Sequence, residues 1–132
     1  MRFLLALIAL CFVVLAFLQL DDPDAVRWFS LYAVGGLMTW LSLVSNLPRG
    51  VVRCCAVATA LIMFFYFFGF FQQVPAVAES GWRSEVGREA MGLLFSSFAM
   101  CLVLAQFSCR LKAIVAASDR SVPTVFSAKD TL

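Results

Sequence analysis

The sequence contains no histidine. Haem and zinc sites that depend on imidazole ligands are therefore excluded, as are Ser-His-Asp and Cys-His nucleophilic systems. A glycine-rich phosphate-binding loop and a Cys-x-x-Cys pair are also missing from the sequence. We therefore expect no cofactor and no catalytic residue of these familiar types.

Charged residues are scarce, at 14% of the chain, whereas 63% of the residues are hydrophobic and the mean hydropathy is +0.95. This composition is far too apolar for a soluble domain of 132 residues. The net charge of +2 is small and gives no basis for nucleic-acid binding. The chain is therefore predicted to be an integral membrane protein, with the lipid bilayer as a partner.

Four apolar runs approach the roughly 20 residues that a membrane-spanning helix needs. They predict spans at about 3–20, 24–44, 54–71 and 88–108. The predicted fold class is all-α, a four-helix transmembrane bundle made of two helical hairpins. Residues 1–110 form a single transmembrane domain in this prediction. Residues 111–132 form a cytoplasmic tail that begins as a short helical extension and is partly mobile.

The basic residues predict the orientation of these spans. Four spans place both termini on one side, where seven basic residues lie, against three on the other side. The seven are Arg2, Arg49, Arg53, Arg110, Lys112, Arg120 and Lys129, and the three are Arg27, Arg83 and Arg88. Because Lys and Arg are enriched in cytoplasmic connections, both termini are predicted to be cytoplasmic. The expected localisation is multi-pass, in a plasma membrane or a bacterial inner membrane.

An acidic turn separates the first two spans, at residues 19–24. Pro23 suits the first position of a new helix, so Asp22 is predicted to be the N-cap of that helix and Asp24 to lie one position into it. Both carboxylates would then lie where the helix dipole is positive.

One face of the second span has aromatic side chains at its outer end and small residues halfway along its length. Trp28 and Tyr32 are predicted to be interfacial anchors in the headgroup region. Gly35 and Gly36 follow them and form a notch that another helix can approach.

The third span ends in six phenylalanines within eight positions, residues 64–71. We interpret them as bulky side chains that face lipid or pack in the core of the bundle. The alternative is that they form a docking surface for a larger membrane complex or for a flat hydrophobic ligand. The outer connection at residues 72–83 follows, with Pro75 and Gly81 as helix breakers.

A compact bundle would bring the outer ends of spans two and four together. The polar residues there would form one patch, which is the candidate site. Its members are Gln19, Asp21, Asp22, Asp24, Glu85, Arg88 and Glu89. Ionisable groups close to a membrane are costly unless they are paired, hydrated or functional.

Two motifs of this outer face carry a family resemblance. The first is Gln-x-Asp-Asp-Pro-Asp at residues 19–24, followed by Trp28 and Tyr32, and the second is Gly-Arg-Glu-Ala-Met-Gly-Leu at residues 87–93. Together they resemble the transmembrane protein 220 family, in which the first motif usually has Asn where this chain has Asp21. The resemblance implies a small multi-span membrane protein and does not imply a particular reaction.

Three functional hypotheses follow for this outer patch. The favoured one is a structural or accessory role, with other membrane protein subunits as partners. In the second, the patch binds a cation or a cationic small molecule through oxygen ligands, although no EF-hand spacing is present. In the third, the acids position magnesium in a lipid-modifying enzyme, which would need a second metal-binding cluster that the sequence lacks. Proton or ion transport is not expected, because the middles of the spans contain no acids or bases.

Overall fold

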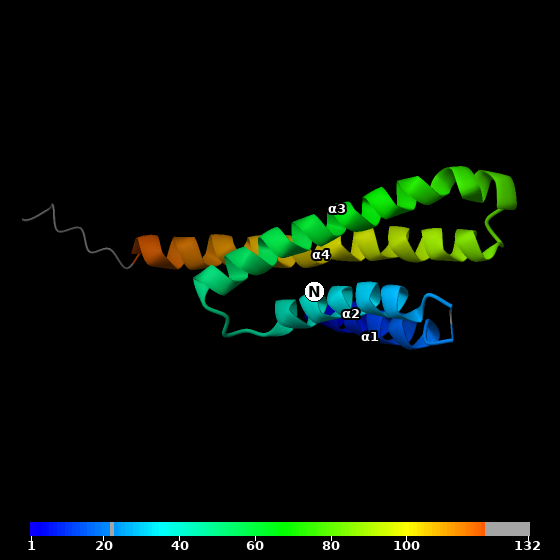
Figure 1. Ribbon diagram of the computed structural model, residues 1–132. Coiled ribbons are helices and arrows are strands. Elements are labelled where there is room, and N and C mark those ends of the chain that lie inside the picture. Colours follow the sequence, from blue (N-terminus) through cyan, green and yellow to red (C-terminus); the bar gives the residue numbers. More distant parts are fainter. Residues whose placement is uncertain (22, 121–132) are drawn as a thin grey trace, which may run out of the picture.

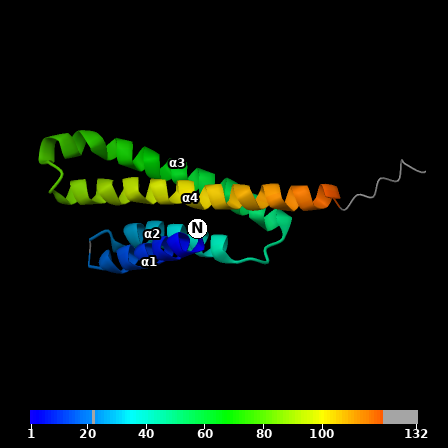
Figure 2. The same cartoon turned by 180° about the vertical axis from the view of Figure 1, so that it is seen from behind.

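The computed structural model describes residues 1–21 and 23–120. Every regular element in these two ranges is an α-helix, in the order α1 (Arg2–Leu18), α2 (Ala25–Leu43), α3 (Arg49–Ser80) and α4 (Glu85–Arg120). Helix α1 packs along α2, and α3 packs along α4, which gives two helical hairpins (Figure 1). The view from behind also places the two hairpin connections at the same end of the molecule (Figure 2). The all-α prediction is confirmed for the described residues.

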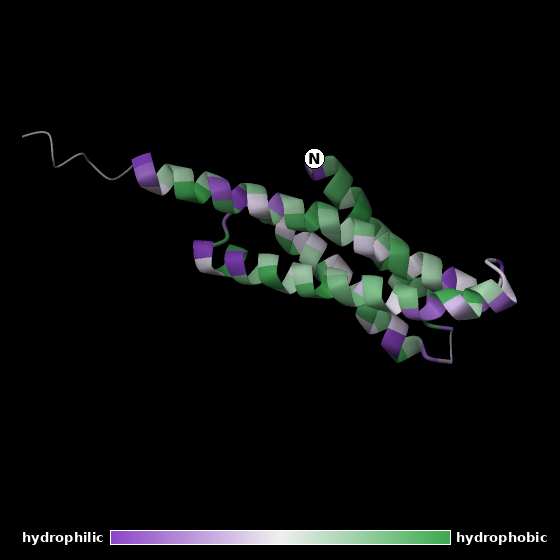
Figure 3. Ribbon diagram, turned by 90° about the horizontal axis from the view of Figure 1, so that it is seen from above, coloured by the Kyte–Doolittle hydropathy of each residue, from purple (hydrophilic) through white to green (hydrophobic). Residues whose placement is uncertain are grey.

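The helices are apolar along their middles, and their hydrophilic residues gather toward the ends of the molecule (Figure 3). Among the described helices, α3 and α4 are long and apolar enough to cross a membrane, and α1 is an apolar helix that falls just short of that length. This distribution agrees with the predicted membrane character of the chain.

Helix α3 is longer than predicted, because Pro75 lies inside it and does not end it. Membrane helices tolerate proline more readily than soluble ones. The helix ends instead at Gly81, which has a φ of 86° and donates its N–H to the Val77 carbonyl oxygen at 2.7 Å. The predicted connection at residues 72–83 is therefore wrong, and the true connection between α3 and α4 is limited to residues 81–84.

Helices α2 and α4 also differ from their predicted limits. Asp24 is the N-cap of α2 and not a residue of its first turn, and its side chain makes no capping hydrogen bond. The predicted N-cap, Asp22, lies outside the described residues. Helix α4 continues past the predicted limit of the fourth span, residue 108, to Arg120, in agreement with the short helical extension expected at the start of the tail. The rest of that tail, residues 121–132, also lies outside the described residues.

The two hairpins meet mainly where α2 lies against α4. The glycine notch of α2 takes side chains from two other helices. A Cβ atom at Gly35 would lie 2.7 Å from a ring carbon of Phe12 in α1 and 3.0 Å from the hydroxyl oxygen of Tyr66 in α3. The prediction that another helix approaches this notch is confirmed.

The core between the helices combines large apolar side chains with small hydroxyl groups. Its largest members include Leu5, Phe12, Trp28, Tyr32, Tyr66, Leu93, Met100 and Phe107. The hydroxyl side chains of Thr39, Ser42, Thr59, Ser96 and Ser97 are fully buried. Each of these hydroxyls donates to a carbonyl oxygen three or four residues earlier in its own helix. The helices therefore satisfy these groups internally and do not rely on them to hold the hairpins together.

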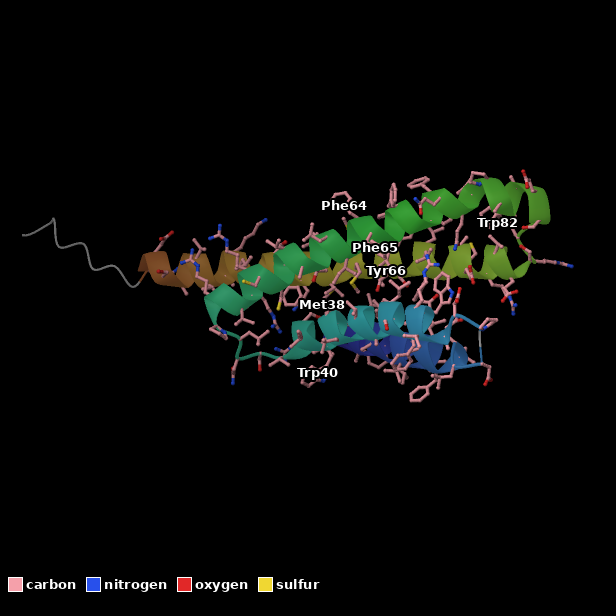
Figure 4. The ribbon with its side chains drawn as sticks, viewed as in Figure 1. Met38, Trp40, Phe64, Phe65, Tyr66 and Trp82 are labelled. Atoms are coloured by element: carbon pink, nitrogen blue, oxygen red, sulfur yellow. The ribbon has the colours of Figure 1, made fainter. Side chains whose placement is uncertain are left out.

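Tyr66 provides a polar link between the hairpins. Its hydroxyl donates a hydrogen bond to the carbonyl oxygen of Leu31 in α2. Figure 4 shows Tyr66 on the side of α3 that faces α2, whereas Phe64 lies on the outer side. The link is buried, so water does not compete for it.

We expect the Tyr66→Phe variant to lower the free energy of unfolding by about 1 kcal/mol, because the bond to the Leu31 carbonyl is lost while the ring stays in place. Ser30→Ala is the control, since the Ser30 hydroxyl is exposed and bonds only to the Val26 carbonyl of its own helix. Thermal unfolding in detergent micelles measures both. Equal melting temperatures for the two variants would show that the tyrosine link does not hold the hairpins together.

Candidate functional site

A cleft of about 810 Å³ lies between α1 and α4, near the end that carries the two hairpin connections. Its lining combines one charged region with a longer apolar wall. The lining residues are Leu10, Cys11, Val14, Leu15, Leu18, Gln19, Tyr32, Glu85, Arg88, Glu89, Met91, Gly92 and Phe95. The volume lies within the range of small-molecule sites in proteins, about 300–1,000 Å³.

The charged region of the cleft comes from two chain segments that meet at the same end. Gln19 lies just after α1, at its C-cap. Glu85, Arg88 and Glu89 lie on the first two turns of α4, and their spacing of three and four residues places them on one helical face. Glu85 and Arg88 are exposed, whereas Glu89 is half-buried. This region carries two carboxylates and one guanidinium, so its formal charge is negative.

The structure divides the predicted outer patch. Four of its seven members line the cleft, namely Gln19, Glu85, Arg88 and Glu89. Asp21 is exposed and is not part of the lining. Asp24 lines a separate shallow hollow together with Arg27 at the start of α2. Asp22 lies outside the described residues.

Glu89 is supported by a residue that the sequence analysis did not assign to the site. The side-chain amide of Gln73 in α3 donates a hydrogen bond to Glu89 Oε2 at 3.2 Å. The carbonyl oxygen of the same side chain, Gln73 Oε1, is buried and has no hydrogen-bond partner among the described residues. The sequence predicts Gln73 in a loop, and the continuation of α3 beyond the predicted limit at residue 71 brings it to Glu89.

Tyr32 also belongs to the site and was not predicted as a lining residue. Tyr32 and Trp28 are each only 2% exposed, and their rings stack with centroids 6.3 Å apart. Both were expected to face the headgroups as interfacial anchors, but their rings are buried between the helices. Tyr32 and Glu89 both line the cleft.

The apolar wall of the cleft runs along three turns of α1. Its residues recur at positions 10, 11, 14, 15 and 18, which lie on one face of the helix. From Leu10 to Leu18 this wall is about 12 Å long at 1.5 Å per residue. Met91 and Phe95 of α4 form the opposite side. The cleft therefore has a charged end and an extended apolar end.

The described residues contain no group of three Asp, Glu or Cys side chains placed to hold a metal ion. The two glutamates of the cleft are accompanied by an arginine, whose positive charge opposes cation binding. The five cysteines are free thiols, and Cys11 lies in the apolar wall. The arrangement is thus better suited to holding a molecule with polar and apolar parts than to holding a bare cation.

Tyr32 of α2 lies against the backbone of α4 at Gly92. A Cβ atom at this position would lie 2.2 Å from the Tyr32 hydroxyl oxygen but 3.4 Å from the Tyr32 ring carbon Cζ. A Cβ atom at 2.2 Å would overlap the hydroxyl oxygen sterically, whereas a Cβ atom at 3.4 Å from the ring carbon is in ordinary van der Waals contact. The hydroxyl oxygen therefore sets the requirement for glycine at position 92.

We expect Gly92→Ala to destabilise the protein by about 1–3 kcal/mol, because the added methyl overlaps the Tyr32 hydroxyl. The double variant Gly92→Ala, Tyr32→Phe is expected to recover most of this loss, since the clashing oxygen is gone. Gly50→Ala is the control, because nothing lies within 4 Å of a Cβ at Gly50. Melting temperatures in detergent measure all three. A double variant less stable than Gly92→Ala alone would contradict this account.

The chain was compared with known proteins. No curated protein and no solved structure matches it. A family model described as "Transmembrane family 220, helix" matches residues 11–105, which is most of the chain. The match includes both outer motifs and every cleft residue except Leu10. The chain therefore belongs to the transmembrane 220 family of membrane proteins.

Proposed function

We propose that the protein binds an amphiphilic molecule in the cleft between α1 and α4. The observation that carries this proposal is the continuity of the cleft, in which a charged end adjoins an apolar wall about 12 Å long. A molecule with a polar head and an apolar chain matches both parts at once. A bare cation would leave the apolar wall unused, and a purely apolar ligand would leave the charged end without a partner.

We further propose that all four helices cross the membrane and that both termini are cytoplasmic. The lengths of α3 and α4 support their crossing. Helices α1 and α2, with 17 and 19 residues, are about 26 and 29 Å long, close to a hydrocarbon thickness of about 30 Å. Small mismatches of this size are accommodated by local thinning of the bilayer. In this topology the charged end of the cleft lies at the outer surface.

An accessory role remains a second candidate, and a different surface favours it. The outer face of α3 exposes Leu61, Phe64, Phe65, Phe68 and Phe71. Within the bundle, α3 packs mainly against α4, so this aromatic face is left to lipid or to another membrane subunit. Nothing among the described residues supports the metal-dependent enzyme hypothesis, because no suitable ligand group is present there.

Filling the cleft tests the proposed binding function. Val14 lines the cleft, whereas its neighbour Val13 does not, and the two side chains are equally exposed, at 49% and 48%. We expect native mass spectrometry of the gently extracted protein to show a co-purified lipid on the wild type and on Val13→Trp. Val14→Trp is expected to lose that lipid, because the indole occupies the apolar wall.

Retention of the same lipid by Val14→Trp would exclude the cleft as the binding site. Loss of the lipid from both variants would show that any large side chain on α1 prevents lipid binding, whether or not it lies in the cleft. That outcome would also contradict the proposal. Circular dichroism of both variants checks that the helices are intact.

The topology is tested by thiol labelling in a background with the five native cysteines replaced. Glu79 and Lys112 are exposed and lie near opposite ends of the second hairpin. We expect Glu79→Cys to react with a membrane-impermeant maleimide added to intact cells, and Lys112→Cys to react only after permeabilisation. The reverse pattern would invert the orientation, and labelling of both in intact cells would show that α4 does not cross the membrane.

A further inference from the structure

The charged end of the cleft displays both signs of charge on one helical face. Arg88 lies between Glu85 and Glu89 in sequence, and all three side chains line the same cavity. A guanidinium binds phosphate and carboxylate groups in a forked geometry. Carboxylates bind ammonium groups. A ligand head that carries an anion and a cation a few atoms apart therefore complements this end better than a head of one sign.

We propose that the cleft holds a zwitterionic phospholipid with a primary amine, phosphatidylethanolamine. The inference rests on the proposed binding function and names the class of its ligand. Arg88 takes the phosphate, and Glu85, one turn nearer the start of α4, takes the ammonium. The acyl chain lies along the α1 wall, between Val14 and Phe95.

The kind of acceptor at this end favours a primary ammonium over a quaternary one. A primary ammonium has three N–H donors, and the cleft offers the carboxylate oxygens of Glu85 and Glu89 and the amide oxygen of Gln19. A quaternary ammonium has no N–H and is usually recognised by a cage of aromatic rings. The aromatic residues of the lining are Tyr32 and Phe95, and Phe95 belongs to the apolar wall, so no such cage surrounds the charged end.

The charge balance disfavours an anionic lipid. Two carboxylates and one guanidinium leave the charged end with a formal charge of −1. An anionic head such as phosphatidylglycerol would gain the contact with Arg88 but would lie beside Glu85 and Glu89 without a compensating cation. The ammonium of the zwitterion supplies that cation.

The test is a lipid titration of the purified, delipidated full-length protein in detergent, followed by native mass spectrometry. The probes are dioleoyl phosphatidylethanolamine, phosphatidylcholine and phosphatidylglycerol. We expect phosphatidylethanolamine to bind about tenfold more tightly than phosphatidylglycerol, the size of one charge-assisted hydrogen bond. Val14→Trp is expected to lose binding of all three lipids.

Two matched pairs of variants assign the parts of the headgroup. Arg88→Gln is expected to weaken phosphatidylethanolamine and phosphatidylcholine alike by about tenfold, because both carry the phosphate. Arg83→Gln, an exposed arginine outside the cleft, is the control and is expected to bind as the wild type does. Glu85→Gln is expected to remove the preference for phosphatidylethanolamine over phosphatidylcholine, and Glu79→Gln is its control.

The possible outcomes separate this inference from the function on which it rests. If the three lipids bind equally, or if Arg88→Gln and Glu85→Gln match their controls, the headgroup assignment is overturned while the loss of binding in Val14→Trp still supports an amphiphile in the cleft. If no lipid binds, or if Val14→Trp binds them as the wild type does, both the assignment and the proposed function fail.

Discussion

The contact of the Tyr32 hydroxyl with the backbone of α4 at Gly92 decides how the two hairpins fit together. Because position 92 has no side chain, the tyrosine ring enters the surface of α4 and α2 approaches α4 closely there. In a membrane, where lipid is as apolar as the helix faces, such close packing is a main source of helix association. The buried Ser and Thr hydroxyls bond within their own helices, so they contribute little to the contact between hairpins.

This way of docking leaves the other side of the bundle open. The first hairpin meets the second mainly through α2, and α1 contacts α4 much less. The polar links between hairpins, from Tyr66 to the Leu31 carbonyl and from Arg110 to the Val44 carbonyl, also involve α2 or the residue that follows it. The cleft is therefore the space that remains where α1 does not reach α4, and it results from the same contact that stabilises the fold.

The sequence predicted the helices well but the site only in part. Hydropathy located the four helical segments, and Gly35 correctly indicated a close approach by other helices. Pro75 misled the prediction, because a breaker in a soluble helix is tolerated in this long apolar one. As a result Gln73 was assigned to a loop, and its bond to Glu89 could not be anticipated.

The structure brings four of the seven predicted patch residues to the cleft and leaves Asp21 and Asp24 outside it, for a related reason. The sequence grouped its members by their expected side of the membrane, which gives their height along the bundle but not their direction around each helix. Asp21 and Asp24 do not line the cleft that Glu89 lines. Only the docking angle of the hairpins, which depends on the fit of Tyr32 against Gly92, determines which carboxylates face one another. A single sequence contains no direct record of that angle.

The arrangement also separates the residues that stabilise the bundle from those of the proposed ligand site. Tyr32 and Gly92 line the cleft at its inner side, where a change alters the packing of both hairpins. Glu85 and Arg88 are exposed at the end of α4, where water hydrates them when the cleft is empty. Because water hydrates these side chains, their charges carry little desolvation cost when no ligand is present. They also remain accessible to a ligand. Half-buried Glu89 lies between these two groups, and the Gln73 amide that supports it ties the charged end of the cleft to α3.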